Sequence, residues 1–152
     1  MKHLKKIENM ALFMRRKILD ISYLSSQAAH LGGGLSIVEI MATLYSHILN
    51  FDKNNPYWEL RDRFILSKGH GVLGYYSALL ASGIISEEKF STYLKNESDL
   101  IAHPIMNLNL GIESSNGSLG QGLGMGIGIA YSAKKNESSK YKTYVLLGDG
   151  EC

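Results

Sequence analysis

Asp149 stands between Gly148 and Gly150, directly after the apolar run 143–147. Mg²⁺ prefers oxygen ligands in an octahedron, often one or two carboxylates together with substrate phosphates. A carboxylate at the carboxyl end of a strand lies in the crevice where α/β sheets bind ligands, and a flanking glycine lets a backbone N–H approach a phosphate oxygen. The motif therefore predicts a magnesium and phosphate site, with a simple turn after the strand as an equal alternative.

Three histidines lie in loops beside glycine or proline: His30 in "AAHLGGG", His70 in "SKGHG" and His103 in "IAHPI". An imidazole can give or take a proton near neutral pH, which suits acid–base chemistry. A single loop histidine more often has no such role. Three of them, together with two glycine-rich segments, favour a shared site. His3 and His47 have no comparable setting, and we assign them no role.

Seven of the sixteen glycines fall between Gly111 and Gly128. Neither G-x-G-x-x-G nor G-K-[ST] can be placed in this segment, which excludes the dinucleotide and P-loop phosphate motifs. We expect a helix here, and its start, "GSLGQG", to offer free backbone N–H groups to a ligand. Glycines inside a helix cost stability, so we expect the later ones to serve close helix packing; they are Gly124, Gly126 and Gly128.

The periodicity of apolar residues predicts the order helix, helix, strand, helix, helix, helix, strand. The strands are expected at 63–67 and 143–147, and a capping box at Ser36 and Glu39 is expected to begin the second helix. Two strands cannot form a stable parallel sheet by themselves. The strand at 143–147 is apolar on both faces, as a central strand would be, so it should have neighbours on both edges, and this chain is not expected to supply enough of them. The pattern resembles the front half of an α/β domain.

Composition sets the broad class. The chain has 152 residues, 45% of them hydrophobic and 20% charged, which is typical of one globular domain. A formal net charge of +2 is too small to indicate nucleic acid or an anionic membrane as a partner. No apolar run reaches transmembrane length. Cys152 is the only cysteine, so neither a disulfide framework nor a zinc cluster is expected, and the default location is cytoplasmic.

Three motifs occur in a specific order: "RDRFILSKGHG", "SNGSLGQGLGMGIGIA" and "YVLLGDGEC". Together they resemble the thiamine-diphosphate-binding N-terminal portion of transketolase, especially the N-terminal subunits of split bacterial transketolases. The resemblance extends from about the first helix to the last residue. It implies a partial three-layer α/β/α thiamine-diphosphate-binding fold, helix-rich and with an incomplete parallel sheet. Residues 1–152 would then be the N-terminal part of one such domain, truncated after the GDG motif.

The resemblance also implies an activity. Transketolases use thiamine diphosphate and Mg²⁺ to move a two-carbon ketol unit between sugar phosphates. By motif, His30 and His103 resemble the two catalytic histidines that face the donor and acceptor hydroxyls. Asp149 would bind Mg²⁺. The residues that would contact the cofactor are His70, Gly117, Ser118, Leu119, Gly148 and Gly150.

The chain departs from the family pattern in two ways. The family usually has H-P-G around its first histidine, whereas this chain has "HLG" after Ala29. The asparagine that completes the Mg²⁺ shell, the remaining strands and the second domain with its activating glutamate are absent. Activity is therefore expected to need further chain or a C-terminal transketolase subunit, in a homo- or hetero-oligomer. Two alternatives stay open: a truncated homologue without catalytic activity, and a fragment similar to deoxyxylulose-phosphate synthase.

Overall fold

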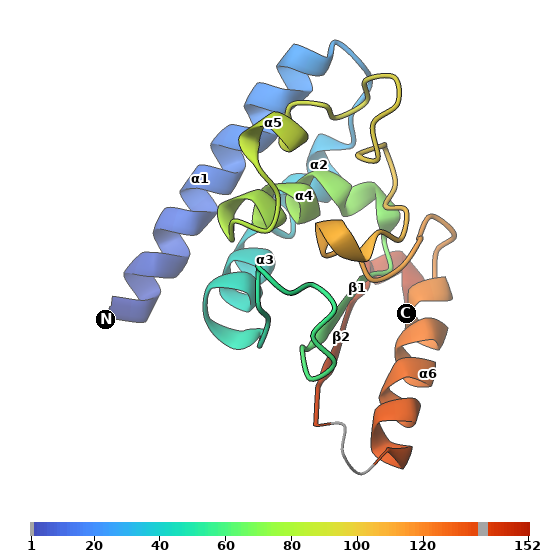
Figure 1. Ribbon diagram of the computed structural model, residues 1–152. Coiled ribbons are helices and arrows are strands. Elements are labelled where there is room, and N and C mark those ends of the chain that lie inside the picture. Colours follow the sequence, from blue (N-terminus) through green and yellow to red (C-terminus); the bar gives the residue numbers. More distant parts are fainter. Residues whose placement is uncertain (1, 137–139) are drawn as a thin grey trace.

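The computed structural model describes residues 2–136 and 140–152 (Figure 1). The α-helices are α1 (Lys2–Ser25), α2 (Leu31–Leu35), α3 (Val38–Thr43), α4 (Val72–Ala81), α5 (Glu87–Phe90) and α6 (Gln121–Lys135). The strands are β1 (Arg63–Leu66) and β2 (Thr143–Leu146). A π-helical turn (Leu44–Ile48) continues α3, and short 3₁₀ turns cover Gly69–Gly71, Leu108–Leu110 and Asp149–Glu151.

The two strands pair in parallel, with Arg63 opposite Thr143 and Leu66 opposite Leu146. Their side chains alternate between two helical layers, as the two-residue period of a strand requires. Phe64 of β1 points to the layer of α1, α3 and α4, where its ring lies 5.1 Å from that of Tyr75. Ile65 points the other way, towards α6, where its Cδ1 would lie 3.8 Å from a Cβ placed at Gly126. The expected α/β class, with a small parallel sheet between helices, is confirmed.

The main core lies between α1, α3, α4 and one face of the sheet. Helix α1 contributes a stripe of buried residues at three- and four-residue steps, which is the spacing of one helix face. Helix α4 is buried along nearly its whole length. It ends at Ala81, and Gly83 just beyond it adopts a positive φ of 75°, the left-handed conformation that commonly terminates a helix. No helix within the described part of the chain is long and apolar enough to cross a membrane.

The structure overturns the expected capping box. Residues 31–35 already form helix α2, so Ser36 lies between two helical segments instead of at a helix start. The Ser36 hydroxyl donates to the Gly33 carbonyl, 3.1 Å away, and Glu39 pairs with Arg15 instead of capping.

Within the described residues β2 has fewer neighbouring strands than its apolar pattern requires, as predicted from the small number of strands in this chain. There β2 pairs with β1 on one edge only, and residues 143–145 are partly exposed.

The glycines of α6 sort into two groups. A Cβ at Gly126 would overlap Val145, so close packing against the sheet is confirmed at this position. Gly122, which had not been assigned to packing, lies equally close to Ser67. Gly124 and Gly128 point outwards, and a Cβ at either would meet nothing within 4 Å. The prediction of close packing is therefore wrong for those two within the described structure.

Candidate active site

Three histidines far apart in the sequence meet at one place. The His30 ring lies 5.8 Å from that of His70 and 6.0 Å from that of His103, both in edge-to-face orientation. His30 is exposed just before α2, His70 lies in the turn between β1 and α4, and His103 lies in the loop 101–117. The structure therefore brings together the three histidines singled out in the sequence.

Two glycines allow this close approach. A Cβ at Gly33 would lie 2.7 Å from His70 Cδ2, so α2 can pack directly against the histidine turn only without a side chain there. A Cβ at Gly69 would lie 2.8 Å from both the Asn116 carbonyl and His103 Cδ2. Contacts this short do not occur for real Cβ atoms, so larger residues at Gly33 or Gly69 would force the histidines apart.

A buried hydroxyl and a carboxylate tie the ends of both strands to the start of α6. The Ser67 hydroxyl donates to Glu151 Oε1 at 2.6 Å and accepts from the Gly122 N–H at 3.1 Å. The Glu151 carboxylate also accepts from the N–H groups of Gly120 at 2.7 Å and Gly148 at 2.6 Å. The expectation of free N–H groups at the helix start is therefore wrong for Gly120 and Gly122, because Glu151 and Ser67 already occupy them.

This network and its surroundings shift the pKa values of Glu151 and His70. Partial burial by itself raises the pKa of Glu151, but hydrogen bonds from Gly120, Ser67 and Gly148 outweigh it and hold the pKa below its usual value. Partial burial lowers the pKa of His70, and the positive charge of Lys68 lowers it further, while Glu151 opposes this shift. His70 is therefore biased towards its neutral form.

Asp149 lies where β2 ends, at the same edge as the histidine turn that follows β1. Its side chain is exposed, and none of the described residues donates a hydrogen bond to it. The following Gly150 is open as well, with nothing within 4 Å of a Cβ placed there. Across residues 2–136 and 140–152, no cluster of three or more His, Cys, Asp or Glu is arranged to hold a metal ion. Asp149 thus offers one carboxylate of a possible oxygen shell.

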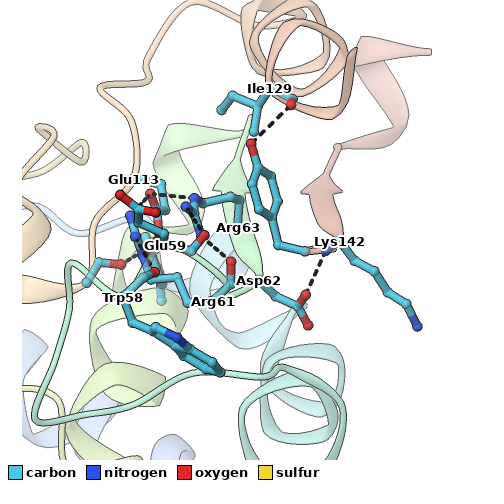
Figure 2. Close-up of polar contacts among 11 residues, drawn as sticks. Trp58, Glu59, Arg61, Asp62, Arg63, Glu113, Ile129 and Lys142 are labelled. Carbon is cyan, nitrogen blue, oxygen red and sulfur yellow. Dashed lines mark hydrogen bonds and ion pairs between the residues drawn. The ribbon is translucent and has the colours of Figure 1, made fainter. Parts of the chain in front are cut away.

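An ion pair that the sequence analysis missed fixes the loop that carries His103 (Figure 2). The Arg61 guanidinium donates two hydrogen bonds of 2.9 Å to the Glu113 carboxylate, and both side chains are about 11% exposed. Arg63 lies 3.9 Å from the same carboxylate. A planar guanidinium facing a carboxylate with two bonds is the strongest and most directional of protein ion pairs. The partners are 52 positions apart in the sequence, which explains why no sequence motif revealed the ion pair.

Further hydrogen bonds hold the same loop. The Tyr75 hydroxyl of α4 donates to the Gly111 carbonyl at 2.8 Å, and the Asn116 N–H donates to the Pro104 carbonyl at 3.1 Å. The amide nitrogen Nδ2 of Asn116 is buried and has no hydrogen-bond partner among the described residues. The residues that follow it are exposed between His103 and α6; they are Gly117, Ser118 and Leu119.

The fold and these groups define a class of protein. Parallel strands between helical layers, with titratable groups gathered at their carboxyl ends, are the arrangement of a ligand-binding α/β domain. Residues 9–152 match the family described as the thiamine diphosphate binding domain of transketolase. The chain belongs to this family, and the resemblance drawn from its motifs is confirmed.

Individual relatives agree with the family. The chain is 42% identical over 146 residues to a subunit of the apulose-4-phosphate transketolase of Actinobacillus succinogenes, covering 96% of this chain and 52% of that protein. It is 38% identical over 122 residues to a subunit of the 6-deoxy-6-sulfo-D-fructose transketolase of Clostridium sp., covering 80% of this chain and 44% of that one. The chain thus spans about half the length of the relatives it matches.

Solved structures show the same fold. Transketolase from Leishmania mexicana superposes with a TM-score of 0.85 at 28% identity, over 95% of this chain and 23% of that one. Transketolase from Campylobacter jejuni superposes with a TM-score of 0.81 at 29% identity, over 99% of this chain and 24% of that one. The architecture is therefore a partial α/β thiamine-diphosphate-binding fold.

Proposed function

We propose that this chain is the diphosphate-side component of a transketolase, which transfers a two-carbon ketol unit between sugar phosphates. One observation carries the proposal: His30, His70 and His103 converge from three separate loops, beside the turn that holds Asp149. Such a group of imidazoles can exchange protons with several hydroxyls of a sugar held among them.

The residues present fit thiamine diphosphate and Mg²⁺. Within residues 2–136 and 140–152, Asp149 is an exposed carboxylate without a hydrogen-bond donor, and Asn116 holds a buried amide donor that lacks an acceptor. Gly150 leaves its backbone open to a phosphate. In the proposal, Asp149 is one Mg²⁺ ligand, and phosphate oxygens and further groups complete the shell. The cofactor contacts come from His70, Gly117, Ser118, Leu119, Gly148 and Gly150.

Each histidine has its own task in the proposal. When bound, thiamine diphosphate supplies the carbon nucleophile and the electron sink for the transfer. His30 and His103 face the substrate and take or return protons at its hydroxyl groups. His70, which partial burial biases towards the neutral form, donates a hydrogen bond to a cofactor phosphate. The loop bonds around Glu113 keep His103 in place for this role.

A partner polypeptide completes the proposed enzyme. The relatives from Actinobacillus succinogenes and Phocaeicola vulgatus are each named as one subunit of a transketolase, and this chain covers 52% and 48% of them. We infer that residues 1–152 form part of one thiamine-diphosphate-binding domain, and that catalysis requires the remainder of that domain and a C-terminal transketolase subunit. The names of the relatives favour sugar ketol transfer over pyruvate-dependent synthesis of deoxyxylulose phosphate.

Reconstitution tests the proposal. The chain, extended to the length of its relatives, is combined with a C-terminal transketolase subunit, and ketol transfer from a ketose phosphate to an aldose phosphate is followed. We expect turnover that requires both thiamine diphosphate and Mg²⁺. His103→Ala is expected to lower kcat by about 100-fold, the usual worth of a positioned acid–base group. Turnover that needs pyruvate as donor, or none with any sugar pair, would refute the assignment.

A further inference from the structure

Three hydrogen-bond donors converge on the carboxylate of Glu151. Its Oε1 accepts from the Ser67 hydroxyl at 2.6 Å and from the Gly120 N–H at 2.7 Å, and its Oε2 accepts from the Gly148 N–H at 2.6 Å. Ser67 is fully buried and Glu151 is partly buried. Both oxygens of this carboxylate are therefore occupied by the chain itself, and Glu151 has no task in the proposed chemistry.

These contacts join three separate segments. Ser67 follows β1, Gly148 follows β2, and Gly120 directly precedes the first residue of α6. The Ser67 hydroxyl in turn accepts from the Gly122 N–H at 3.1 Å, which ties the first turn of α6 to the end of β1. Hydrogen bonds to an ionised carboxylate are roughly twice as strong as those between neutral groups. Glu151 and Ser67 therefore fix both strand ends relative to the start of α6.

The GDG turn is closed from both of its ends. The Gly148 N–H donates to Glu151 Oε2, and the Glu151 N–H donates back to the Gly148 carbonyl at 3.1 Å. Asp149 lies inside this closed turn, although none of the described residues donates to its own side chain. Residues 117–119, the other segment assigned to the cofactor, lead directly into Gly120, which Glu151 also holds. One carboxylate therefore sets the placement of both segments that the proposed function assigns to the cofactor.

A carboxylate suits this position, and an amide does not. All three partners of Glu151 are donors. Two are backbone N–H groups, and the hydroxyl of Ser67 already accepts from Gly122, so its proton is directed at Glu151. A carboxylate is an acceptor at both oxygens, whereas a glutamine side chain has one acceptor oxygen and an NH₂ group that only donates. In either orientation of a glutamine, that NH₂ group would face the N–H of Gly120 or of Gly148. Glu151→Gln therefore breaks at least one bond while it changes the size of the side chain little.

We propose that Glu151 and Ser67 are positioning residues for the cofactor site. They hold the GDG turn and residues 117–119 at a fixed separation, so that one thiamine diphosphate with its Mg²⁺ contacts both segments. The inference rests on the proposed function, because it takes the ligand of these segments from there. Neither residue touches the reacting atoms in the proposal, so their loss should impair cofactor binding and spare turnover once the cofactor is bound.

Calorimetry on the reconstituted enzyme, with thiamine diphosphate as the titrant at saturating Mg²⁺, tests this role. Glu151→Gln removes a charge and a bond, whereas Ser67→Ala removes the bond to Glu151 and leaves the charge. We expect each variant to raise the dissociation constant by about 10-fold or more, as the loss of a residue that orients ligands commonly does, with kcat at saturating cofactor within about twofold of the wild type. The double variant should bind about as the weaker single variant does, because both residues act through the same bond. Glu8→Gln, which removes an exposed carboxylate of α1, is the control and should bind as the wild type does.

Hydrogen exchange in the cofactor-free reconstituted enzyme tests the contacts without any cofactor or turnover. In Glu151→Gln, peptides covering 117–123 and 146–152 should exchange about 10-fold faster, because the carboxylate no longer holds these two segments together. Peptides from α4 should exchange as in the wild type, which shows that the fold is retained.

The outcomes separate this inference from the proposed function. Wild-type enzyme that binds no thiamine diphosphate refutes the proposed function and this inference with it. If the wild type binds, unchanged affinity or unchanged exchange in Glu151→Gln contradicts the positioning role alone. Weakened binding in Glu151→Gln together with unaltered binding in Ser67→Ala would show that the charge acts and the placement does not, which also contradicts that role. A loss of kcat as large as the loss of affinity would contradict it as well.

Discussion

Helices α4 and α6 have the same kind of sequence and opposite surroundings. Neither α4 nor residues 121–133 of α6 contain a charged residue. Yet nine of the ten residues of α4 are buried, against three of fifteen in α6. An uncharged helix is expected to be buried by neighbouring elements. The described residues bury α4 in this way but leave most of α6 exposed. Three comparisons between covered and uncovered positions, and one dependence of stability on pH, test this account.

The largest expected effect concerns apolar side chains in the two helices. Leu79 of α4 is fully buried, so Leu79→Ala should lower the free energy of unfolding by about 2–5 kcal/mol through lost burial and a cavity. Ile127→Ala in α6 should change it by less than about 0.5 kcal/mol, measured at a dilution that keeps the chain monomeric. Urea denaturation of both variants gives the comparison, and equal losses would show that α6 is covered within the chain.

Ion pairs should show the same contrast between buried and exposed positions. Glu113→Gln removes the negative charge between Arg61 and Arg63 and should cost about 3 kcal/mol, since two partly buried guanidinium groups lose their partner. The matched control is the more exposed pair of Lys89 and Asp99, where Asp99→Asn should cost about 0.5 kcal/mol or less. A cost for Glu113→Gln as small as that of the control would remove the ion pair from the account of how His103 is positioned.

Replacing two glycines of α6 with alanine should change the free energy of unfolding in opposite directions. A Cβ at Gly122 would lie 2.5 Å from the Ser67 Cβ, so Gly122→Ala should destabilise the chain by about 1–3 kcal/mol. A Cβ at Gly128 would meet nothing within 4 Å, so Gly128→Ala should stabilise the monomer by about 0.5–1 kcal/mol through helix propensity. Thermal unfolding at low concentration distinguishes the two. Destabilisation by Gly128→Ala would indicate a neighbour within the chain.

The smallest expected effect is a dependence of the free energy of unfolding on pH, caused by His70. Burial lowers the pKa of His70 from its usual 6.5, so the unfolded chain binds this proton more readily than the folded one. The resulting stability is present above pH 6.5 and is lost as the pH falls through the lower, folded-state pKa. We expect His70→Gln to flatten the stability profile just below pH 6.5. An unchanged slope in that variant would show that His70 is not desolvated in the fold.

Local patterns predicted the elements well. The strands expected at 63–67 and 143–147 follow from neighbours in sequence, and the structure confirms them as Arg63–Leu66 and Thr143–Leu146. The capping box at Ser36 failed because the glycine-rich segment before it is itself helical. The Ser-x-x-Glu motif is present in the sequence, but it lies between two helical segments and does not cap the start of a helix.

Contacts between distant residues could not be predicted in the same way. Glu151 occupies donors at the start of α6, and its bond to Ser67 joins residues 84 positions apart. The pairing of Arg61 with Glu113 spans 52 positions. The packing of Gly122 and Gly126 likewise depends on Ser67 and on the strands beneath α6. These contacts require knowledge of which segments lie together, and periodicity does not contain that information.

Thiamine diphosphate binding tests the central claim most directly. In the enzyme reconstituted with its C-terminal partner, calorimetry should show Mg²⁺-dependent binding that Asp149→Asn weakens by about 100-fold, because one anionic ligand is lost. Asp99→Asn, which removes an exposed carboxylate outside the GDG turn, is the control and should bind as the wild type does. The 152-residue chain alone should bind weakly or not at all, because at the GDG turn its described residues offer Asp149 as the one carboxylate without a hydrogen-bond donor. Unchanged Mg²⁺-dependent affinity in Asp149→Asn would contradict the assignment of the GDG turn as the cofactor site.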